Sequence, residues 1–289
     1  MSDHESLFRE RYGKWALILG ASDGLGAALA EAAAQRGLNC ILVARRAQKL
    51  DALARQLRHN HNVDVKALAL DLTSSNAKDT LVGLIGEFDI GSVFLNAGGD
   101  TLGTRLVDAD PDAIDALISR NVLLLTHLAR LFSKHFIDRD RGGLAVIGSD
   151  SALNGAGRIS VYSATKAYAL NLIESLWAEL QHTGVDATYF VIGTTDTPKL
   201  RSLLTARSVA PDAVSLAEPD MLAHWVMDNL PNGPTQVFDV SPDSMDPLTS
   251  PQARRARVAR NTDIIDFFFG DLSPDPTLLA SLKSGRSWK

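Results

Sequence analysis

The stretch that indicates the fold of this chain is Gly20-Ala21-Ser22-Asp23-Gly24-Leu25-Gly26, a G-x3-G-x-G spacing. It follows a short apolar run, Trp15–Leu19, and opens a segment over residues 25–33 in which leucine and alanine recur at helical spacing. Such a turn lets the backbone approach a pyrophosphate, which the free N–H groups at the helix N-terminus can bind. The stretch therefore predicts a dinucleotide site, with a purely packing role for the glycines as the alternative.

Short apolar segments alternate with longer amphipathic ones along the rest of the chain. The segments expected as strands are Trp15–Leu19, Cys40–Val43, Val65–Leu70, Val93–Leu95, Leu144–Ile147, Ala187–Ile192 and Gln236–Val240. The segments expected as helices are 25–36, Gln48–Arg58, a short one around Leu81–Ile85, a long one over Ala113–Lys134, and Tyr162–Gln181. Continuous apolar strands separated by helices are typical of a parallel sheet covered on both faces. We therefore expect an α/β, doubly wound Rossmann fold with a seven-stranded parallel sheet.

The length of 289 residues allows one domain or two. The alternation of strands and helices stops near Ser241, and prolines then frame one basic-then-apolar helix around Arg254–Phe269. We expect a single domain over residues 1–240 that binds both cofactor and substrate. Residues 241–289 are expected to form a C-terminal extension that is helical in part.

The composition argues against several classes of function. With 29 basic and 34 acidic residues, the chain lacks the basic surplus of a nucleic-acid-binding protein. One cysteine cannot form an internal disulfide, and no apolar run reaches the roughly 18 residues of a membrane helix. The segment Met1–Lys14 lacks the apolar stretch of a signal peptide, and the histidines show no metal-ligand spacing. We expect a cytoplasmic protein with no metal, no nucleic-acid partner and no membrane span.

Arg45 indicates which dinucleotide is bound. It ends the second expected strand, at the place after the glycine turn where an NAD site usually carries an acidic residue for the ribose 2′-hydroxyl. An arginine at this position suits a 2′-phosphate instead, because guanidinium and phosphate form charge-assisted, bidentate hydrogen bonds. The sequence therefore favours NADP(H). The alternative is that Arg45 and Arg46 only begin a solvated helix face.

Tyr162 and Lys166 are four positions apart, and hence on one face of the helix expected there. A free tyrosine titrates near pH 10, too high for efficient proton exchange at neutral pH. A neighbouring ammonium stabilises the phenolate and makes the tyrosine a usable general acid or base. This spacing alone is common by chance, but together with the glycine turn it favours a catalytic pair.

Taken in order, the motifs of Trp15–Val240 resemble the short-chain dehydrogenase/reductase family. Besides the glycine turn and Tyr162-x3-Lys166, two motifs resemble cofactor contacts of the family: Asp71-Leu72, which would contact the adenine, and Asn96-Ala97-Gly98 after the fourth strand. Asn121 matches the family's catalytic asparagine, and Ser149 has the family's spacing before Tyr162. Gly193, Thr195 and Thr197 resemble the loop that contacts the nicotinamide carboxamide. Within the family, Tyr12-Gly13-x-Trp15-Ala16 is most similar to the branch of 3-oxoacyl-CoA reductases and hydroxysteroid dehydrogenases.

The resemblance implies hydride transfer between nicotinamide C4 and a carbonyl carbon. Tyr162 would supply the proton and Lys166 would lower the tyrosine pKa and bind the nicotinamide ribose. Ser149 would hold the substrate oxygen, and Asn121 would position a water that relays protons to Lys166. Homodimers or homotetramers are common in the family.

The chain also departs from the family pattern. Leu95 replaces the first asparagine of the usual Asn-Asn-Ala-Gly motif, and Ile192 replaces a proline before Gly193. Asp23 stands where many NADP-dependent members have a basic residue, so the preference for NADP(H) depends on Arg45. Asp150, directly after Ser149, is acidic near the expected substrate pocket, and nothing in the sequence explains it.

The expected activity is interconversion of a carbonyl and a secondary alcohol. The segment Lys199–Glu218, which closes over the substrate in the family, is apolar with a few basic groups, and this suits a steroid-like or 3-oxoacyl-like compound. The alternatives are a reductase of sugars, polyols or aromatic ketones, and a non-catalytic NADP-binding regulator. The physiological substrate and its direction of conversion stay open.

Overall fold

The computed structural model describes residues 3–99, 103–210, 213–240, 246 and 248–259. The chain divides into two compact units, residues 1–239 and 240–289. All elements named below up to β7 belong to the first unit. In the second unit the structure describes a helix over residues 251–259, so residues 260–269 of the helix expected around Arg254–Phe269 lie outside the described residues.

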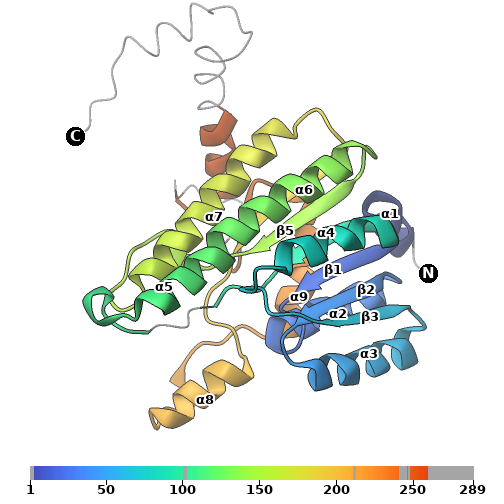
Figure 1. Cartoon of the computed structure of the whole chain (residues 1–289). Helices are drawn as coiled ribbons and strands as arrows, with labels where there is room; N and C mark the ends of the chain where they lie inside the picture. Colours follow the sequence, from blue (N-terminus) through green and yellow to red (C-terminus); the bar gives the residue numbers. More distant parts are fainter. Residues whose placement is uncertain (1–2, 100–102, 211–212, 241–245, 247, 260–289) are drawn as a thin grey trace, which may run out of the picture. The chain divides into compact units, whose positions relative to one another are not determined.

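Within the described residues, seven parallel strands form one sheet in the order β3-β2-β1-β4-β5-β6-β7 (Figure 1). Their bounds are β1 Trp15–Leu19, β2 Asn39–Ala44, β3 Val65–Ala69, β4 Ile90–Leu95, β5 Gly142–Ile147, β6 Val185–Val191 and β7 Thr235–Val237. The strand order reverses between β1 and β4, the switch point at which doubly wound sheets bind their ligands. The predicted doubly wound, seven-stranded Rossmann fold is confirmed.

Helices cover both faces of the sheet (Figure 1). One face carries α2 Gly24–Gln35, α3 Ala47–His61 and α9 Pro219–Asn229, and the other carries α4 Ala77–Glu87, α6 Leu125–Ile137 and α7 Ser160–Glu179. The remaining helices are α1 Asp3–Tyr12, α5 Pro111–Ile118 and α8 Pro198–Ala206. Alternate residues of each central strand enter the two cores, which is why these strands read as continuous apolar runs.

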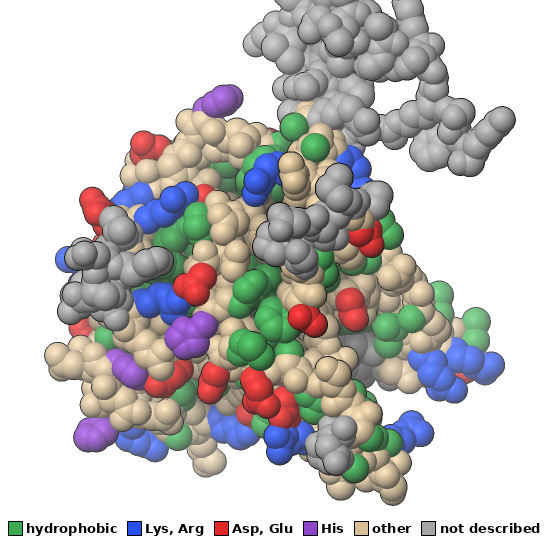
Figure 2. Space-filling model, turned by 180° about the vertical axis from the view of Figure 1, so that it is seen from behind, with side chains coloured by type: hydrophobic (Ala, Val, Ile, Leu, Met, Phe, Trp, Pro, Cys, Tyr) green, Lys and Arg blue, Asp and Glu red, His purple; other side chains and the backbone are tan. Residues whose placement is uncertain are grey.

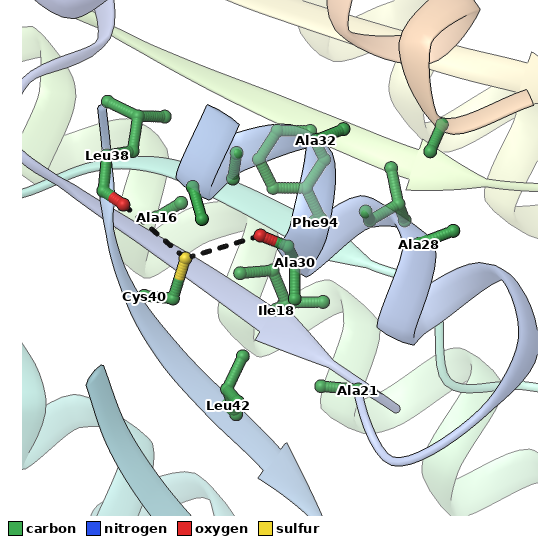
Figure 3. Close-up of a cluster of buried hydrophobic side chains, with 14 of the residues drawn as sticks. Ala16, Ile18, Ala21, Ala28, Ala30, Ala32, Leu38, Cys40, Leu42 and Phe94 are labelled. Carbon is green, nitrogen blue, oxygen red and sulfur yellow. Dashed lines mark hydrogen bonds between the residues drawn. The ribbon is translucent and has the colours of Figure 1, made fainter. Parts of the chain in front are cut away.

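The core under α2 and α3 contains Cys40, the single cysteine of the chain (Figure 3). Its thiol is fully buried and donates to the carbonyl oxygens of Ala30 and Leu38, each at 3.6 Å. Burial raises the pKa of Cys40 to about 12, with the charge of Glu31 adding to the effect. Cys40 therefore serves as a small core residue.

The long helix predicted over Ala113–Lys134 is interrupted. Residues Ser119–Leu124 form a π-helical segment between α5 and α6, with wider i→i+5 turns. The segment buries Asn121 and Leu124 against the body of the protein. The residues Ser119–Leu124 include no proline or glycine that would mark a break, so the sequence pattern predicted one continuous helix.

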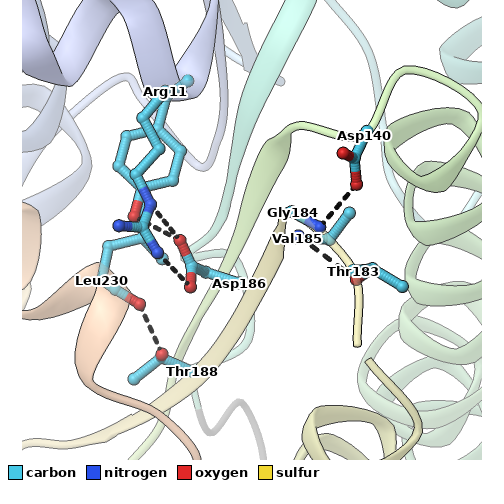
Figure 4. A network of polar contacts seen from close by, with 9 residues as sticks. Arg11, Asp140, Thr183, Gly184, Val185, Asp186, Thr188 and Leu230 are labelled. Carbon is cyan, nitrogen blue, oxygen red and sulfur yellow. Dashed lines mark hydrogen bonds and ion pairs between the residues drawn. The ribbon is translucent and has the colours of Figure 1, made fainter. Parts of the chain in front are cut away.

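Helix α1 was not predicted, because the segment Met1–Lys14 is polar. It is held by the side chain of Asp186 in β6 (Figure 4). Arg11 donates to both oxygens of Asp186 through Nε (2.8 Å) and Nη2 (2.9 Å), and the Tyr12 hydroxyl donates to Oδ2 (2.7 Å). Tyr12 is 1% exposed. Two tertiary anchors, rather than helix propensity, therefore hold α1 in place.

The last strand is shorter than predicted. The pattern predicted Gln236–Val240, whereas β7 spans Thr235–Val237 and ends where Asp239 adopts a φ of +61°. Acidic and basic side chains are interspersed over the surface seen from behind (Figure 2). In the part of the chain that the structure describes, no helix is long and apolar enough to cross a membrane.

Candidate active site

The predicted site residues lie on elements that end at or start from the carboxyl edge of the sheet. The glycine turn follows β1, Arg45 follows β2, Asp71 follows β3, Asn96-Ala97-Gly98 follows β4 and Ser149 follows β5. Asn121 comes from the π-helical segment, and Tyr162 and Lys166 come from the first two turns of α7. Since parallel strands end at one edge, motifs that are far apart in the sequence meet there.

The glycine turn is shaped by its own backbone. A Cβ added to Gly26 would lie 2.0 Å from the Gly20 carbonyl oxygen and 2.7 Å from Asn96 Nδ2, so only glycine fits. The Asn96 amide donates to that same carbonyl at 3.4 Å and joins the β4 loop to the turn. The side chain of Leu25 is buried in the core under α2. A tight glycine turn at the start of α2 fits a dinucleotide pyrophosphate.

Asp23, the departure from the family pattern, gathers two cations at this turn. Its carboxylate accepts from the Gly24 amide (3.0 Å) and forms ion pairs with Lys49 (2.6 Å) and Arg46 (3.2 Å). Arg46 also donates to the Ser22 hydroxyl at 2.9 Å. Burial acts to raise the pKa of Asp23, but the bonds from Lys49 and Gly24 outweigh it and lower the pKa overall. Asp23 therefore stays anionic and holds Arg46 and Lys49 beside the turn.

Arg45 is exposed at the end of β2, and its charge acts on Asp71 at the end of β3. The Asp71 carboxylate accepts from the Thr73 amide (2.9 Å) and hydroxyl (2.8 Å). These bonds are the main cause of the lowered pKa of Asp71, with the charges of Arg45 and Arg120 adding to it. Arg45 and Asp71 thus border one region beside the switch point, while the side chain of Leu72 is buried.

Asn121 is 6% exposed, and its side chain joins three elements. Its Nδ2 donates to Thr165 Oγ1 of α7 (3.1 Å) and to the Gly98 carbonyl (3.4 Å). Its Oδ1 accepts from Arg120 Nε at 3.1 Å. The asparagine amide therefore holds the β4 loop, the π-helical segment and α7 together.

Lys166 is buried, and its Nζ donates to the Ile147 carbonyl at the end of β5 (3.0 Å). The same ammonium lies 5.6 Å from the centre of the Tyr162 ring. Burial, and then the charge of Arg120, lower the pKa of Lys166 to about 8. A Cβ on Gly98 would be 3.4 Å from Nζ and 3.1 Å from Asn121 Oδ1, so this glycine keeps the space between them open.

Ser149 starts a short 3-10 turn, Asp150–Ala152, that packs against α7. Its Oγ accepts from the Ser151 amide (3.2 Å) and donates to Asp150 Oδ1 (2.9 Å), with Ser151 Oγ at 3.1 Å. A hydroxyl has one proton, and a carboxylate is its strongest acceptor here. The hydroxyl must therefore turn away from Asp150 before it can donate to a substrate oxygen, which gives the unexplained acidic residue a physical role.

The loop after β6 reaches the glycine turn at its far end. The methyl group of Thr197 lies against Gly24, and the Thr197 hydroxyl caps α8 by accepting from the Leu200 amide at 3.2 Å. Thr195 donates to the Gly193 carbonyl at 3.2 Å and pairs with Ala217. The structure thus brings Thr197 to the cofactor turn, while Gly193 and Thr195 bond within their own loop.

Three residues of this site were missed by the sequence patterns: Lys49, Arg120 and Thr165. Each acts through a tertiary contact, with Asp23 for Lys49, with Asn121 for Thr165 and with the Gly99 carbonyl for Arg120. Arg120 could have been noticed as a cation adjacent to a catalytic-type asparagine.

Fold and site together place the chain among the Rossmann-fold oxidoreductases. A family model described as short chain dehydrogenase matches residues 14–208, and the chain belongs to this family.

Curated relatives agree with this assignment. The chain is 32% identical over 196 residues to a 7beta-hydroxysteroid dehydrogenase of Collinsella aerofaciens, an alignment that covers 68% of this chain and 74% of the relative. It is 31% identical over 188 residues to a very-long-chain 3-oxoacyl-CoA reductase of Podospora anserina, covering 63% of this chain and 55% of that relative. The expected branch of the family is thereby supported.

Solved structures are similar over most of the chain. One, from work on the stereoselectivity of 7beta-hydroxysteroid dehydrogenase, has a TM-score of 0.75 at 25% identity and covers 94% of this chain and 98% of its own. A short-chain dehydrogenase from Sphingobium yanoikuyae in complex with NADPH has a TM-score of 0.71 at 28% identity, covering 90% and 96%.

Proposed function

We propose that this oxidoreductase uses NADP(H) to interconvert a carbonyl and a secondary alcohol on a hydrophobic substrate, and that it acts in the cytoplasm. Residues 1–240 would hold both cofactor and substrate in one domain. The observation that carries the proposal is the buried ammonium of Lys166, which lies over the Tyr162 ring at the edge where the glycine turn begins α2. A cation in this place can stabilise the Tyr162 phenolate, which is what a phenol that exchanges a proton near neutral pH requires.

In the proposed reaction Tyr162 transfers the proton to or from the substrate oxygen. Lys166 stabilises the phenolate electrostatically, because its buried ammonium lies 5.6 Å from the ring centre. The bond from Nζ to Ile147 O fixes the ammonium without cancelling its charge. When bound, the nicotinamide ring supplies or accepts the hydride.

Ser149 and Asn121 complete the proposed proton path. Ser149 donates to the substrate oxygen once its hydroxyl leaves Asp150, at the point where negative charge develops. Asn121 borders the same small cavity as Lys166 and Thr165, and it bonds to the Gly98 carbonyl of the β4 loop. Its amide thereby preserves space for a water molecule between the two side chains.

The preference for NADP(H) is supported by the charges at the ends of β1 and β2. Arg45, Arg46 and Lys49 contribute three positive charges there, and Asp23 compensates one. The surplus suits the extra phosphate of NADP(H). The NADPH complex of the Sphingobium relative agrees with this choice.

Arg45→Asp is expected to weaken NADPH binding by roughly 100-fold and NADH binding by less than threefold. Charge-assisted hydrogen bonds are worth about 1.5–3 kcal/mol, and the new carboxylate would repel the 2′-phosphate. Dissociation constants follow from the nicotinamide fluorescence of each cofactor. Arg55→Asp, the same charge change at an exposed position further along α3, is the matched control. Equal weakening of NADPH and NADH binding would show that Arg45 does not bind the 2′-phosphate.

The proposed substrate is steroid-like or 3-oxoacyl-like, as for the relatives. The segment after β6 is partly helical rather than a loop, with α8 spanning Pro198–Ala206. It presents Leu203 (58% exposed) and Val209 (36% exposed) to solvent. Apolar side chains at the edge of a site can bury an apolar substrate.

The test of the proposed function is turnover of hydrophobic ketones with NADPH, and of the matching alcohols with NADP, followed at the nicotinamide absorbance. We expect steroid ketones and 3-oxoacyl thioesters to exceed sugars and polyols in kcat/KM. Oxidation of NADPH by sugars alone would overturn the substrate class. Binding of NADPH without turnover of any carbonyl would overturn the catalytic function.

We also propose that the chain forms a homodimer or homotetramer. A groove between α6 and α7 exposes apolar side chains of Ile137, Leu172 and Leu176, bordered by charged ones such as Arg130, Lys134 and Glu179. A second copy placed there would remove this surface from water. Sedimentation equilibrium should give two or four times the mass of the chain, and the mass of a single chain would contradict the proposal.

A further inference from the structure

Arg120 is the first donor of a series of hydrogen bonds that ends at the backbone of Tyr162. Its Nε donates to Asn121 Oδ1 (3.1 Å), Asn121 Nδ2 donates to Thr165 Oγ1 (3.1 Å), and Thr165 Oγ1 donates to the Tyr162 carbonyl (2.8 Å). Each donor in the series uses a separate proton. The series therefore connects the π-helical segment to the turn of α7 that carries Tyr162 and Lys166.

Arg120 and the Gly98 carbonyl both set the direction of this series, because the carbonyl can only accept from the Asn121 nitrogen. A guanidinium can only donate, so the Asn121 oxygen must face Arg120 and the Asn121 nitrogen must face Thr165. The second arm of the guanidinium, Nη2, donates to the Gly99 carbonyl at 3.0 Å. Arg120 thus holds the β4 loop and the orientation of the Asn121 amide with one rigid fork.

Arg120 also acts on Lys166 through its charge. The two side chains line one cavity together with Asn121 and Thr165. The titratable or charged groups around Lys166 are Tyr162 of α7 and Arg120 of the π-helical segment. The uncharged groups are the Ile147 carbonyl of β5 and Gly98 of the β4 loop. From β6, the Tyr189 hydroxyl bonds to the Lys166 carbonyl rather than to its ammonium. Arg120 is thus the like charge that opposes the Lys166 ammonium.

We propose that Arg120 is a positioning residue of the proton path, whose fork fixes Asn121 and Gly99 and whose charge opposes that of Lys166. The proposal rests on the proposed function, because it assigns Arg120 to the same proton path. Arg120 itself transfers no proton. Its two effects, geometric and electrostatic, are separable by substitution.

Two substitutions separate the effects. Arg120→Gln removes the charge but keeps an amide donor for Asn121, whereas Arg120→Lys keeps the charge but loses the planar fork. We expect the glutamine variant to move the basic limb of the kcat–pH profile upward by roughly half to one pH unit, since Lys166 then keeps its proton to higher pH. The lysine variant should keep the limb within about 0.2 units of wild type and lower kcat about threefold to tenfold.

The pH dependence of NADPH binding is measured alongside, by fluorescence and without any carbonyl present. We expect the same upward shift for the glutamine variant in this titration. Arg120→Met, which fills similar space, replaces the glutamine variant if that chain does not fold, as judged by thermal melting. A basic limb that stays in place in the uncharged variant, or that moves equally far in Arg120→Lys, overturns the proposal.

Failure of this proposal is distinguishable from failure of the proposed function. If wild type binds NADPH but reduces no carbonyl, the function is wrong, while the binding titration still tests the effect of Arg120 on Lys166. If wild type turns over and neither profile moves in the uncharged variant, only the role of Arg120 is wrong.

Discussion

Tyr162→Phe is expected to lower kcat by roughly 10²–10⁴-fold while NADPH binds within about threefold of wild type. The substitution removes the oxygen that exchanges the proton and leaves the ring under the Lys166 ammonium, where the 5.6 Å contact is with the ring face. Binding and packing are therefore retained, and the chemical step alone is slowed. Steady-state turnover with a hydrophobic ketone, together with fluorescence titration of NADPH, measures the two quantities.

Tyr168→Phe is the matched control on the same helix. The Tyr168 ring is 39% exposed, and its hydroxyl bonds to Thr126 Oγ1 at 2.8 Å, away from Lys166. Loss of this hydroxyl should leave kcat within about twofold of wild type. If the Tyr162→Phe enzyme is as active as this control, Tyr162 does not transfer the proton in the reaction.

Asp186→Ala is expected to lower the free energy of unfolding by about 2–4 kcal/mol. The substitution removes the acceptor of three hydrogen bonds and leaves the buried Tyr12 hydroxyl without its partner. The lower end of the range allows for Arg11, whose side chain is 51% exposed and can bond to water. Urea unfolding followed by tryptophan fluorescence measures the change.

Tyr12→Phe is the companion variant, because it removes one of the three bonds and leaves the ion pair of Arg11. We expect a loss of about 1 kcal/mol. Burial, and then the charge of Asp186, raise the pKa of Tyr12, so the stability it contributes is full below about pH 10 and is lost as the pH rises further. The phenylalanine variant should lose less stability than wild type above pH 10.

Asp186→Ala with wild-type stability would contradict the prediction, because it would show that α1 is held by its apolar contacts alone.

Much of the sheet could be predicted from the sequence, because strands buried on both faces are apolar at every position. Boundaries such as Trp15–Leu19 follow directly from this pattern. Helix α1 and the π-helical segment could not be predicted, for two different reasons. The first depends on Asp186, which is far from Arg11 in the sequence. The second contains no proline or glycine that would mark it within the helical run.

The site residues could be predicted as a set, but their bonds could not. The glycine turn, Asn121, Ser149 and the Tyr162–Lys166 pair meet the spacing of a known family, and the fold brings their elements to one edge. Spacing carries no information on which donor faces which acceptor. The bond from Ser149 to Asp150 and the fork of Arg120 are therefore results of the structure.

Cys40 has a practical consequence as the only thiol of the chain, buried between β2 and α2. A thiol reagent can reach it only when these two elements separate. Helix α2 begins within the glycine turn, and β2 accepts hydrogen bonds from Gly20 and Ala21 of that turn at the Val43 carbonyl. The rate of alkylation at Cys40 therefore reports how often β2 and α2 separate by local unfolding, and no engineered cysteine is needed. Slower alkylation in the presence of a nucleotide would report its binding even if no substrate were known.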